Sequence, residues 1–470
     1  MGGREIVELE TERREGTDLP ALPRRNLLLF TVALGVLLNP LNSSLVAVAL
    51  ARLEHAFGLD FAAASWLISA YYLASAIAQP VMGKLADLFG RKKVFLSGLI
   101  LVAVSSATAP FAPSYGWLIV FRLIQSFGSG AIYPAGMGIV RHVITERQSQ
   151  ALAFLSVFSS GAAAFGPSIG GVLVHYGDWP AIFWVNFPFV IVGFGMALAV
   201  LPKDKPRKRA GALPDWLRYL DVPGVVLFAG TIVTGLLFLL SVTDHPIWGA
   251  GILAIAAGAL LVAVELRVAT PFLDVRMFRR NLSLTWVLVQ FVTVNVIFYS
   301  IFFGMPTYLQ EARGLNAQET GLLMLAVAGF GVIVAPLTGR WVAKGGVRPP
   351  LVLAGICMTA GSALFWTLHS ASSIAWLVFC LSVLGVSNGF NNVGLQTALF
   401  QVAPKEVIGV ASGLFQTSRY MGTILSTVLL GLFFGHQLDT ASLHKLGTVL
   451  AMLGMAVIWM SWRLPGRSEG

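Results

Sequence analysis

Long apolar runs separated by short polar loops dominate this sequence. Each run holds about 20 residues, the length that an α-helix needs to cross the hydrocarbon core of a bilayer. Only 11% of the residues are charged, against about 25% in a soluble domain, so most side chains must face lipid or other apolar helices. We therefore expect an all-α integral membrane protein with fourteen transmembrane helices, at about residues 27–50, 64–83, 94–112, 116–140, 151–175, 181–201, 222–241, 248–267, 283–309, 320–342, 350–369, 373–397, 407–435 and 445–463.

The lysines and arginines fall mainly on one side of these runs. When successive polar segments are assigned to alternate faces, 27 of the 32 basic residues lie on one face and three on the other, and the remaining two, Arg122 and Arg419, lie inside runs. Because short cytoplasmic loops are enriched in Lys and Arg, we expect both termini in the cytoplasm. The expected location is the plasma membrane, which in bacteria is the inner membrane. These loops explain the net charge of +10, so nucleic acid is not an expected partner.

One basic loop, residues 83–93, joins the second and third runs. It begins with a glycine, contains a second glycine, and carries one carboxylate among four basic residues. Glycines let the backbone turn tightly and approach a neighbour closely. This pattern resembles the signature loop between helices 2 and 3 of the major facilitator superfamily of transporters. The resemblance implies a latch on the cytoplasmic side, formed through charge and helix-end contacts by Gly83, Asp87, Gly90 and Arg91.

Two further motifs are similar to the fourteen-helix drug:proton antiporter branch of that superfamily. The fourth run contains Arg122, Gln125 and Gly128 in an Arg-x-x-Gln-x-x-Gly pattern. The fifth run contains Gly-Pro-x-x-Gly-Gly at 166–171. A proline removes one helix hydrogen bond, and glycines permit close helix packing. The resemblance implies a hinge or seal that favours export, and tight packing alone is the alternative, for Gly166, Pro167 and Gly170.

The segment Lys203–Asp221 divides the chain, because it holds six basic residues between apolar runs. Gly339 and Gly346 repeat, in weaker form, the spacing of Gly83 and Gly90, which indicates a duplication. Facilitators place a substrate site between two such halves near the middle of the membrane. The expected organisation is an N-terminal tail (1–26), an N-terminal six-helix bundle (27–202), a linker with two extra helices (203–268), a C-terminal six-helix bundle (269–464) and a short tail (465–470).

No aspartate, glutamate or histidine lies deep inside a run, and Glu265 comes nearest to an exception. The antiporter branch usually carries an aspartate in the first helix, at the position that Asn42 occupies here. An amide forms hydrogen bonds but does not take up and release a proton. The resemblance implies coupling to a proton gradient, whereas the residues offer no proton carrier at depth. Either a group near a cavity mouth, such as Glu54, Asp60 or Glu311, binds the proton, or transport is not coupled to protons.

Arg122 and Arg419 are the two charges inside runs, and charges in a membrane are expensive and often functional. Arg122 either attracts an anionic substrate group from the cavity or fastens helices by bonding Asn42 and Gln125. Arg419 shares a polar helix stripe with Gln416 and Thr423, which favours a cavity position over interhelical packing. Other amides and aromatics suit an amphipathic ligand, or equally bond helices together; Tyr72, Tyr299 and Gln396 are of this kind. The expected substrate cavity comprises Asn42, Tyr71, Arg122, Gln125, Gln290, Asn295, Asn388, Asn392, Gln416 and Arg419.

These observations favour a secondary transporter that exports amphipathic small molecules by alternating access. A carrier of organic anions or lipid-like molecules is the alternative, because the two buried charges are both positive. An enzyme would need acids, histidines or cysteines converging in the runs, and a primary pump would need a phosphate-binding loop; the sequence has neither. We expect no cofactor, no metal site, and a protein that functions as a monomer in the lipid bilayer.

Overall fold

A computed structural model describes residues 22–59, 61–204, 221–242, 246–268, 271–315, 317–369, 371–434 and 439–464. Within these ranges the regular structure is helical throughout. Most of the expected N-terminal tail, residues 205–220 of the expected linker, Asp60 and the tail 465–470 lie outside the described residues. The side chains of Pro167 and Glu311 also lie outside them.

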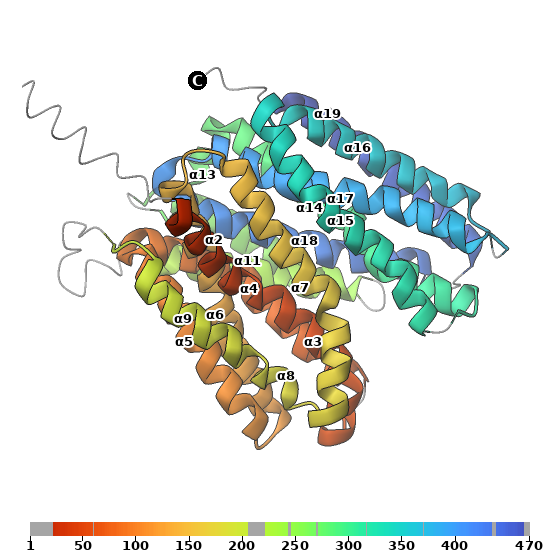
Figure 1. The fold of residues 1–470 in the computed structure, drawn as a ribbon, viewed down its shortest axis with the longest axis horizontal. Coiled ribbons are helices and arrows are strands. Elements are labelled where there is room, and N and C mark those ends of the chain that lie inside the picture. The colour runs from red at the N-terminus through yellow and green to blue at the C-terminus, as the bar shows by residue number, and fades with distance from the viewer. Residues whose placement is uncertain are drawn as a thin grey trace, which may run out of the picture.

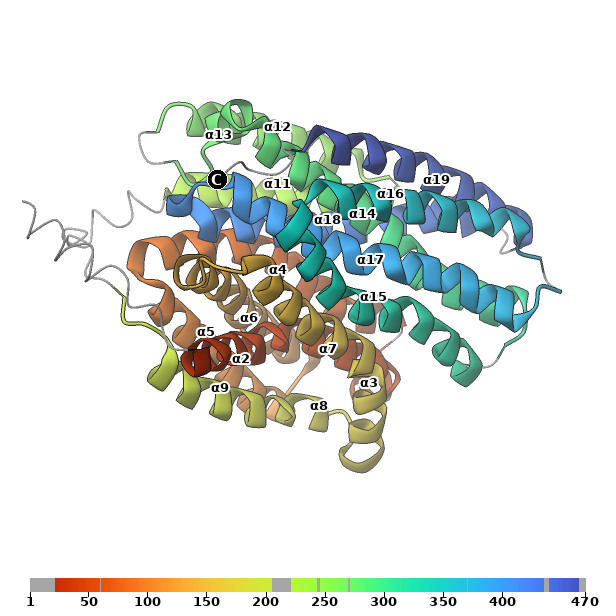
Figure 2. The same cartoon turned by 45° about the horizontal axis from the view of Figure 1, so that its top comes forward.

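The helices form two groups that lie side by side, with an additional pair beside them (Figures 1 and 2). The N-terminal group consists of α2 (Leu22–Val36), α3 (Leu38–Phe57), α4 (Phe61–Phe89), α5 (Arg91–Thr108), α6 (Tyr115–Val143), α7 (Gln148–Gly177), α8 (Ala181–Trp184) and α9 (Asn186–Val200). The additional pair is α11 (Val222–Ser241) and α12 (Trp248–Glu265). The C-terminal group consists of α13 (Val275–Arg280), α14 (Leu282–Thr307), α15 (Ala317–Gly345), α16 (Arg348–Ala363), α17 (Ile374–Val402), α18 (Ile408–Phe434) and α19 (Thr440–Arg463).

Two of the expected spans are broken, the first near its middle and the sixth near its start. The first divides into α2 and α3, and the sixth into α8 and α9. In each case a proline follows the break within a few residues, Pro40 in α3 and Pro188 in α9. Proline has no N–H to bond the carbonyl four residues earlier, so the continuous helix is interrupted at these points.

Ten helical segments among the described residues are long and apolar enough to cross a membrane. They correspond to α2–α3, α5, α8–α9, α11, α12, α14, α15, α16, α17 and α19. Four more of the expected spans are long helices as well but are not among the ten, namely α4, α6, α7 and α18.

The two groups meet closely at the end of the molecule that carries residues 83–93, which we call the basic end. There α4 crosses α18 so tightly that a Cβ atom on Gly83 would lie 2.2 Å from the carbonyl oxygen of Gly409. A second crossing at the same end joins α7 to α15, where the Ser149 hydroxyl donates to the Gly339 carbonyl at 2.9 Å. Gly83 in α4 and Gly339 in α15, which hold matching positions in the two similar sequence motifs, thus both lie at crossings between the groups.

Candidate functional site

A cavity of about 240 Å³ lies between the two groups. It is lined by α3, α4, α6 and α7 on one side and by α14, α15, α17 and α18 on the other. The N-terminal side contributes hydroxyl groups, from Ser43, Ser44, Ser156, Ser159 and Ser160. The C-terminal side contributes aromatic rings of α14, from Phe298, Tyr299, Phe302 and Phe303. A ligand in this cavity would therefore meet a polar wall and an aromatic wall.

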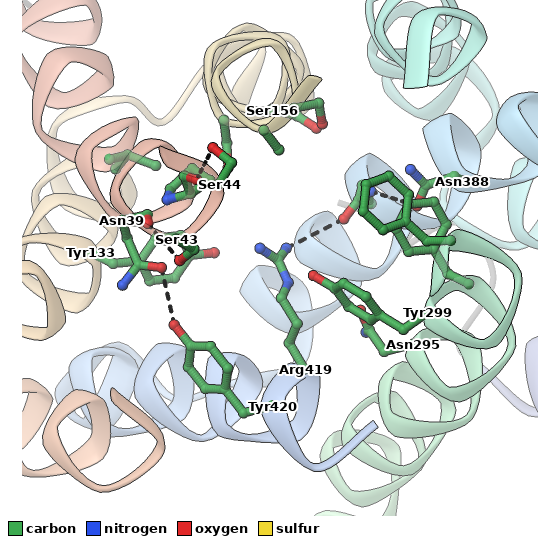
Figure 3. A pocket seen from close by; sticks show the side chains of 18 of the residues that line it. Asn39, Ser43, Ser44, Tyr133, Ser156, Asn295, Tyr299, Asn388, Arg419 and Tyr420 are labelled. Carbon is green, nitrogen blue, oxygen red and sulfur yellow. Dashed lines mark hydrogen bonds between the residues drawn. The ribbon is translucent and has the colours of Figure 1, made fainter. Parts of the chain in front are cut away.

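Arg419 extends from α18 between these walls (Figure 3). Among the described lining residues it is the one charged side chain. Its Nη2 atom donates to Asn392 Oδ1 at 3.4 Å, and Asn392 in turn donates to Asn388 Oδ1 at 2.9 Å. The guanidinium lies 5.6 Å from the centre of the Phe291 ring. Neutral amides and a ring hold this charge in place but do not neutralise it, so it remains available to an anionic group.

Tyrosine and amide contacts join α3, α4 and α18 beside the cavity. The Tyr420 hydroxyl donates to Asn39 Oδ1 at 3.0 Å and accepts from Gln79 Nε2 at 3.0 Å. The Tyr72 and Tyr420 rings lie 5.5 Å apart. Below them α4 and α18 stay in contact as far as Gly83 and Gly409. The described structure therefore separates the cavity from the basic end.

Arg122 lies behind the cavity wall, in a buried polar network within the N-terminal group. It is 1% exposed, donates from Nη1 to Gln125 Oε1 at 2.5 Å, and stacks 4.1 Å above the Tyr71 ring. Gln125 donates to Asn42 Oδ1 at 3.1 Å, and Asn42 exchanges two hydrogen bonds of 2.9 Å with Asn186. These bonds join the two broken spans. Arg122 thus bonds Gln125 and reaches Asn42 only through Gln125, and its Nε and Nη2 atoms have no hydrogen-bond partner among the described residues.

The structure divides the expected cavity residues into two sets. The residues that line the cavity are Asn295, Asn388, Asn392 and Arg419. The residues that do not line it are Asn42, Tyr71, Arg122 and Gln125, which form the buried network, Gln290, which donates to Ser461 Oγ at 2.8 Å, and Gln416, which is buried in α18. Sequence reasoning missed Asn39, the five serines, Tyr133 and Tyr420. The only sequence signal for the serines is their spacing on α7, where Ser156, Ser159 and Ser160 share one helix face.

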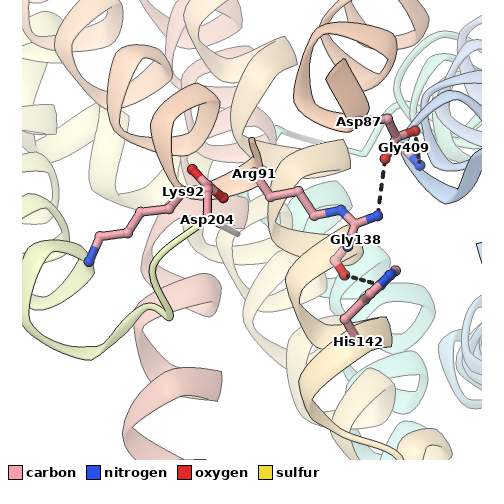
Figure 4. Close-up of polar contacts among 7 residues, drawn as sticks. All are labelled: Asp87, Arg91, Lys92, Gly138, His142, Asp204 and Gly409. Atoms are coloured by element: carbon pink, nitrogen blue, oxygen red, sulfur yellow. Dashed lines mark hydrogen bonds and ion pairs between the residues drawn. The ribbon is translucent and has the colours of Figure 1, made fainter. Parts of the chain in front are cut away.

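The prediction of a loop at residues 83–93 is wrong in one respect: α4 continues to Phe89 and α5 begins at Arg91, so only Gly90 lies outside helix. Asp87, in the last turn of α4, makes contacts across the basic end (Figure 4). Asp87 Oδ1 pairs with Arg91 Nη2 at 3.1 Å, and Oδ2 accepts from the Gly409 N–H at 3.0 Å. One carboxylate therefore joins the start of α5 to the start of α18. Gly90 has φ of 109°, a backbone conformation that suits glycine.

An acid that sequence reasoning missed completes this end. Asp204 accepts from the Lys92 and Lys93 N–H groups at 3.1 Å each, which caps the start of α5. A Cβ atom on Gly90 would lie 2.4 Å from the Asp204 carboxyl, so the glycine also makes room for the cap.

Asp87 makes the basic end sensitive to pH. Burial raises the pKa of Asp87 from 3.8 to about 6, and the Arg91 charge opposes this only in part. A conformation that exposes Asp87 restores the lower pKa, so the closed conformation binds the proton more tightly. The closed conformation is therefore favoured most below pH 3.8 and loses this advantage as the pH rises through about 6.

This effect can be measured with a cysteine at position 149, in a variant whose Cys357 and Cys380 are replaced by alanine. Ser149 is 5% exposed in the closed conformation, so thiol labelling reports opening. We expect the fraction of open protein, corrected for the thiolate fraction, to fall between neutral pH and about 5. Asp87→Asn should remove this dependence; an unchanged pH profile in that variant would contradict the assignment to Asp87.

The glycines of α7 differ sharply in the room around them. A Cβ atom on Gly166 would lie 1.8 Å from Ser44 Oγ and 2.6 Å from Ser44 Cβ, whereas one on Gly170 would lie 3.2 Å from Leu45 and one on Gly171 would meet nothing within 4 Å. The backbone of Pro167 continues α7, and its side chain lies outside the described residues. Gly166 thus sets the closest approach of α3 and α7 beside the cavity.

Gly166→Ala should lower the thermal unfolding midpoint, since overpacking a tight contact costs about 1–3 kcal/mol. It should also lower transport activity, because Ser44 lines the cavity. Gly171→Ala is the matched control and should be neutral or slightly stabilising, by up to about 1 kcal/mol. Equal behaviour of the two variants would show that the α3–α7 contact is not specific.

Comparison with known proteins agrees with this architecture. Residues 32–427 match the family model described as Major Facilitator Superfamily. The chain is 46% identical to the uncharacterized MFS-type transporter YwoD of Bacillus subtilis, over 93% of this chain and 97% of that one. It is 30% identical to the tetracenomycin C resistance and export protein of Streptomyces glaucescens, over 87% of this chain and 76% of that one. The crystal structure of the human organic anion transporter MFSD10 superposes with a TM-score of 0.68 at 16% identity, covering 93% of this chain and 99% of that one. The chain is therefore a membrane transporter, not an enzyme, and belongs to the major facilitator superfamily.

Proposed function

We propose that this protein exports amphipathic small molecules across the plasma membrane by alternating access. The observation that carries the proposal is the cavity between the two helix groups, which joins an aromatic wall to a hydroxyl wall and is closed towards the basic end. Apolar contact with a few orienting polar groups is what such ligands require. The export activity named for the Streptomyces relative supports the outward direction.

The proposed topology has fourteen crossings, with both termini in the cytoplasm and the basic end on the cytoplasmic side. The bundles are proposed at 27–202 and 269–464, with the linker and additional helices at 203–268. The distribution of 27 basic residues against three supports this orientation. In that orientation the described conformation is closed to the cytoplasm.

A second candidate function, transport of organic anions, is favoured by one observation. Arg419 is the one charged side chain among the described cavity-lining residues. An anionic group on an amphipathic substrate would form charge-assisted hydrogen bonds with the guanidinium, whereas a cationic substrate would be repelled. Within the proposed export function we therefore expect amphipathic anions to be preferred over cations.

The proposal can be tested with the purified protein in lipid vesicles. Three fluorescent amphipathic compounds of similar size, one cationic, one neutral and one anionic, are followed with and without an imposed pH gradient. We expect the anionic compound to move fastest and every flux to exceed that of protein-free vesicles. Flux equal to protein-free vesicles for all three compounds would refute export of amphipathic molecules. A response to the pH gradient would support coupling to protons, and no response would refute it.

A further inference from the structure

Three charged side chains from three helices hold one short loop near the basic end. Lys84 on α4 donates to the first carbonyl of the loop 271–273. Asp221, at the start of α11, accepts a hydrogen bond from the Phe272 N–H at 3.0 Å. Glu265, at the end of α12, accepts one from the Leu273 N–H at 3.1 Å. The N-terminal group, the additional helix pair and the segment leading into the C-terminal group therefore meet at these three side chains.

The two acids of this cluster are buried together. Asp221 is 4% exposed and Glu265 is 1% exposed. A Cβ atom on Gly224 would lie 2.5 Å from Asp221 Oδ2 and 2.6 Å from Glu265 Oε1, so both carboxyls crowd against this glycine. The two buried carboxyl groups therefore lie next to each other. The Glu265 Oε2 atom is buried, and no protein N–H or O–H donates to it within the part of the chain that the structure describes.

Two ionised carboxylates placed next to each other repel, because both are acceptors only, and a hydrogen bond between them requires a proton. We propose that Asp221 and Glu265 form a proton-binding site at which two carboxyl groups share one proton. With that proton the pair carries one negative charge, which Lys84 balances. Without it, a second negative charge would be buried against Lys84, which among the described residues is the one cation that interacts with both acids, and such burial is costly.

The charged residues around Asp221 and Glu265 agree with this charge balance. Among the described residues, Lys84 on α4 is the cation with an electrostatic interaction with both acids. Arg276 on α13 donates instead to the carbonyl of Leu266. The loop 271–273 itself carries no titratable side chain. The shared proton is thus the donor that the buried acid pair lacks.

The position of Lys84 links this site to the contact between the two groups. It follows Gly83, which packs against Gly409 of α18. Separation of α4 from α18 would withdraw the lysine from the acid pair, and the proton affinity of the pair would change with it. This link rests on the proposed transport cycle, whereas the shared proton does not.

Infrared spectroscopy of the full-length protein in nanodiscs tests the site directly. At neutral pH we expect a C=O stretch from a protonated carboxyl that shifts in heavy water. The band should disappear in Glu265→Gln and in Asp221→Asn, and it should persist in Glu146→Gln, which alters an exposed acid at the same end. Spectra of the wild-type protein and Glu265→Gln that coincide in this region would overturn the proposal.

Thermal unfolding provides a second readout that does not depend on the Asp221 variant being folded. The wild-type midpoint should fall as the pH rises above neutral, because the shared proton is lost. Glutamine mimics a protonated glutamate, so Glu265→Gln should hold its midpoint over the same range. A wild-type midpoint that depends on sodium concentration and not on pH would mean that a metal cation, and not a proton, lies between the acids, and would also overturn the proposal.

Discussion

Replacing Arg419 by glutamine should lower the flux of an anionic amphipathic substrate by about tenfold to a hundredfold. The side chain is the one charge among the described lining residues, and neutral amides hold it towards the cavity. Hydrogen bonds to charged groups contribute about 1.5–3 kcal/mol, and each 1.4 kcal/mol is about tenfold in affinity. A neutral compound of the same size should lose far less, so the ratio of the two fluxes is the quantity to measure.

Two further variants make this test specific. Arg419→Lys keeps the charge and should retain part of the anion flux, although its ammonium lacks the planar guanidinium fork. Arg340→Gln removes an exposed arginine at the basic end and should leave the flux ratio unchanged. If Arg419→Gln reduces anionic and neutral fluxes equally, its role is structural and the preference for anions is wrong.

Replacing Gly83 by leucine should abolish transport by preventing closure of the basic end. Even a Cβ atom at this position would lie 2.2 Å from the backbone oxygen of Gly409, and backbone cannot move aside as a side chain can. Overpacking of this kind costs about 1–3 kcal/mol, which lowers the ratio of closed to open protein by about fivefold to 150-fold. Labelling of a cysteine at position 149 should become fast in the variant, since that position is buried only when α7 meets α15.

Gly195→Leu is the matched control, because a Cβ atom at Gly195 of α9 meets nothing within 4 Å and the residue is exposed. It should keep both transport and slow labelling. Slow labelling and normal flux in Gly83→Leu would mean that the tight crossing of α4 and α18 is not required for the cycle.

The contacts of Asp87 at the basic end show which features could be predicted from the sequence and which could not. Asp87, Gly90 and Arg91 were expected to act there because a loop of this composition resembles a known signature. The contact between Asp87 and Gly409 spans 322 residues, and no local pattern identifies such a partner. The same holds for Asp204, which lies 112 residues from the N–H group of Lys92 that it caps.

Polar residues inside apolar runs were a partial guide to the cavity. The rule that such residues avoid lipid selects Arg419 and Asn392, which line the cavity, and equally Arg122 and Asn42, which lie behind its wall. Polarity predicts that a side chain faces protein or water, but it does not predict which protein surface lies opposite. Serines gave no signal beyond their spacing on α7, because a serine can bond its own helix, as Ser43 does to the Asn39 carbonyl at 2.9 Å.

The helix pattern itself was more predictable than the helix ends. Every expected span corresponds to helix, yet the first and sixth are broken, and Asn42 and Asn186 join the two broken spans. The sequence contains the cause of the breaks, since Pro40 and Pro188 cannot bond the preceding turn. A run of apolar residues does not reveal that Asn42 and Asn186 bond each other.

Paired spin labels at both ends of the molecule test alternating access most directly. One pair joins exposed residues of the two groups at the basic end, Glu146 and Lys344, and the other joins Tyr176 and Ser373 at the opposite end. On addition of a transported substrate, we expect the distance distribution at the basic end to gain a longer component while the opposite end gains a shorter one. Distances that lengthen at both ends together, or that stay fixed while substrate is transported, would contradict alternating access between these two helix groups.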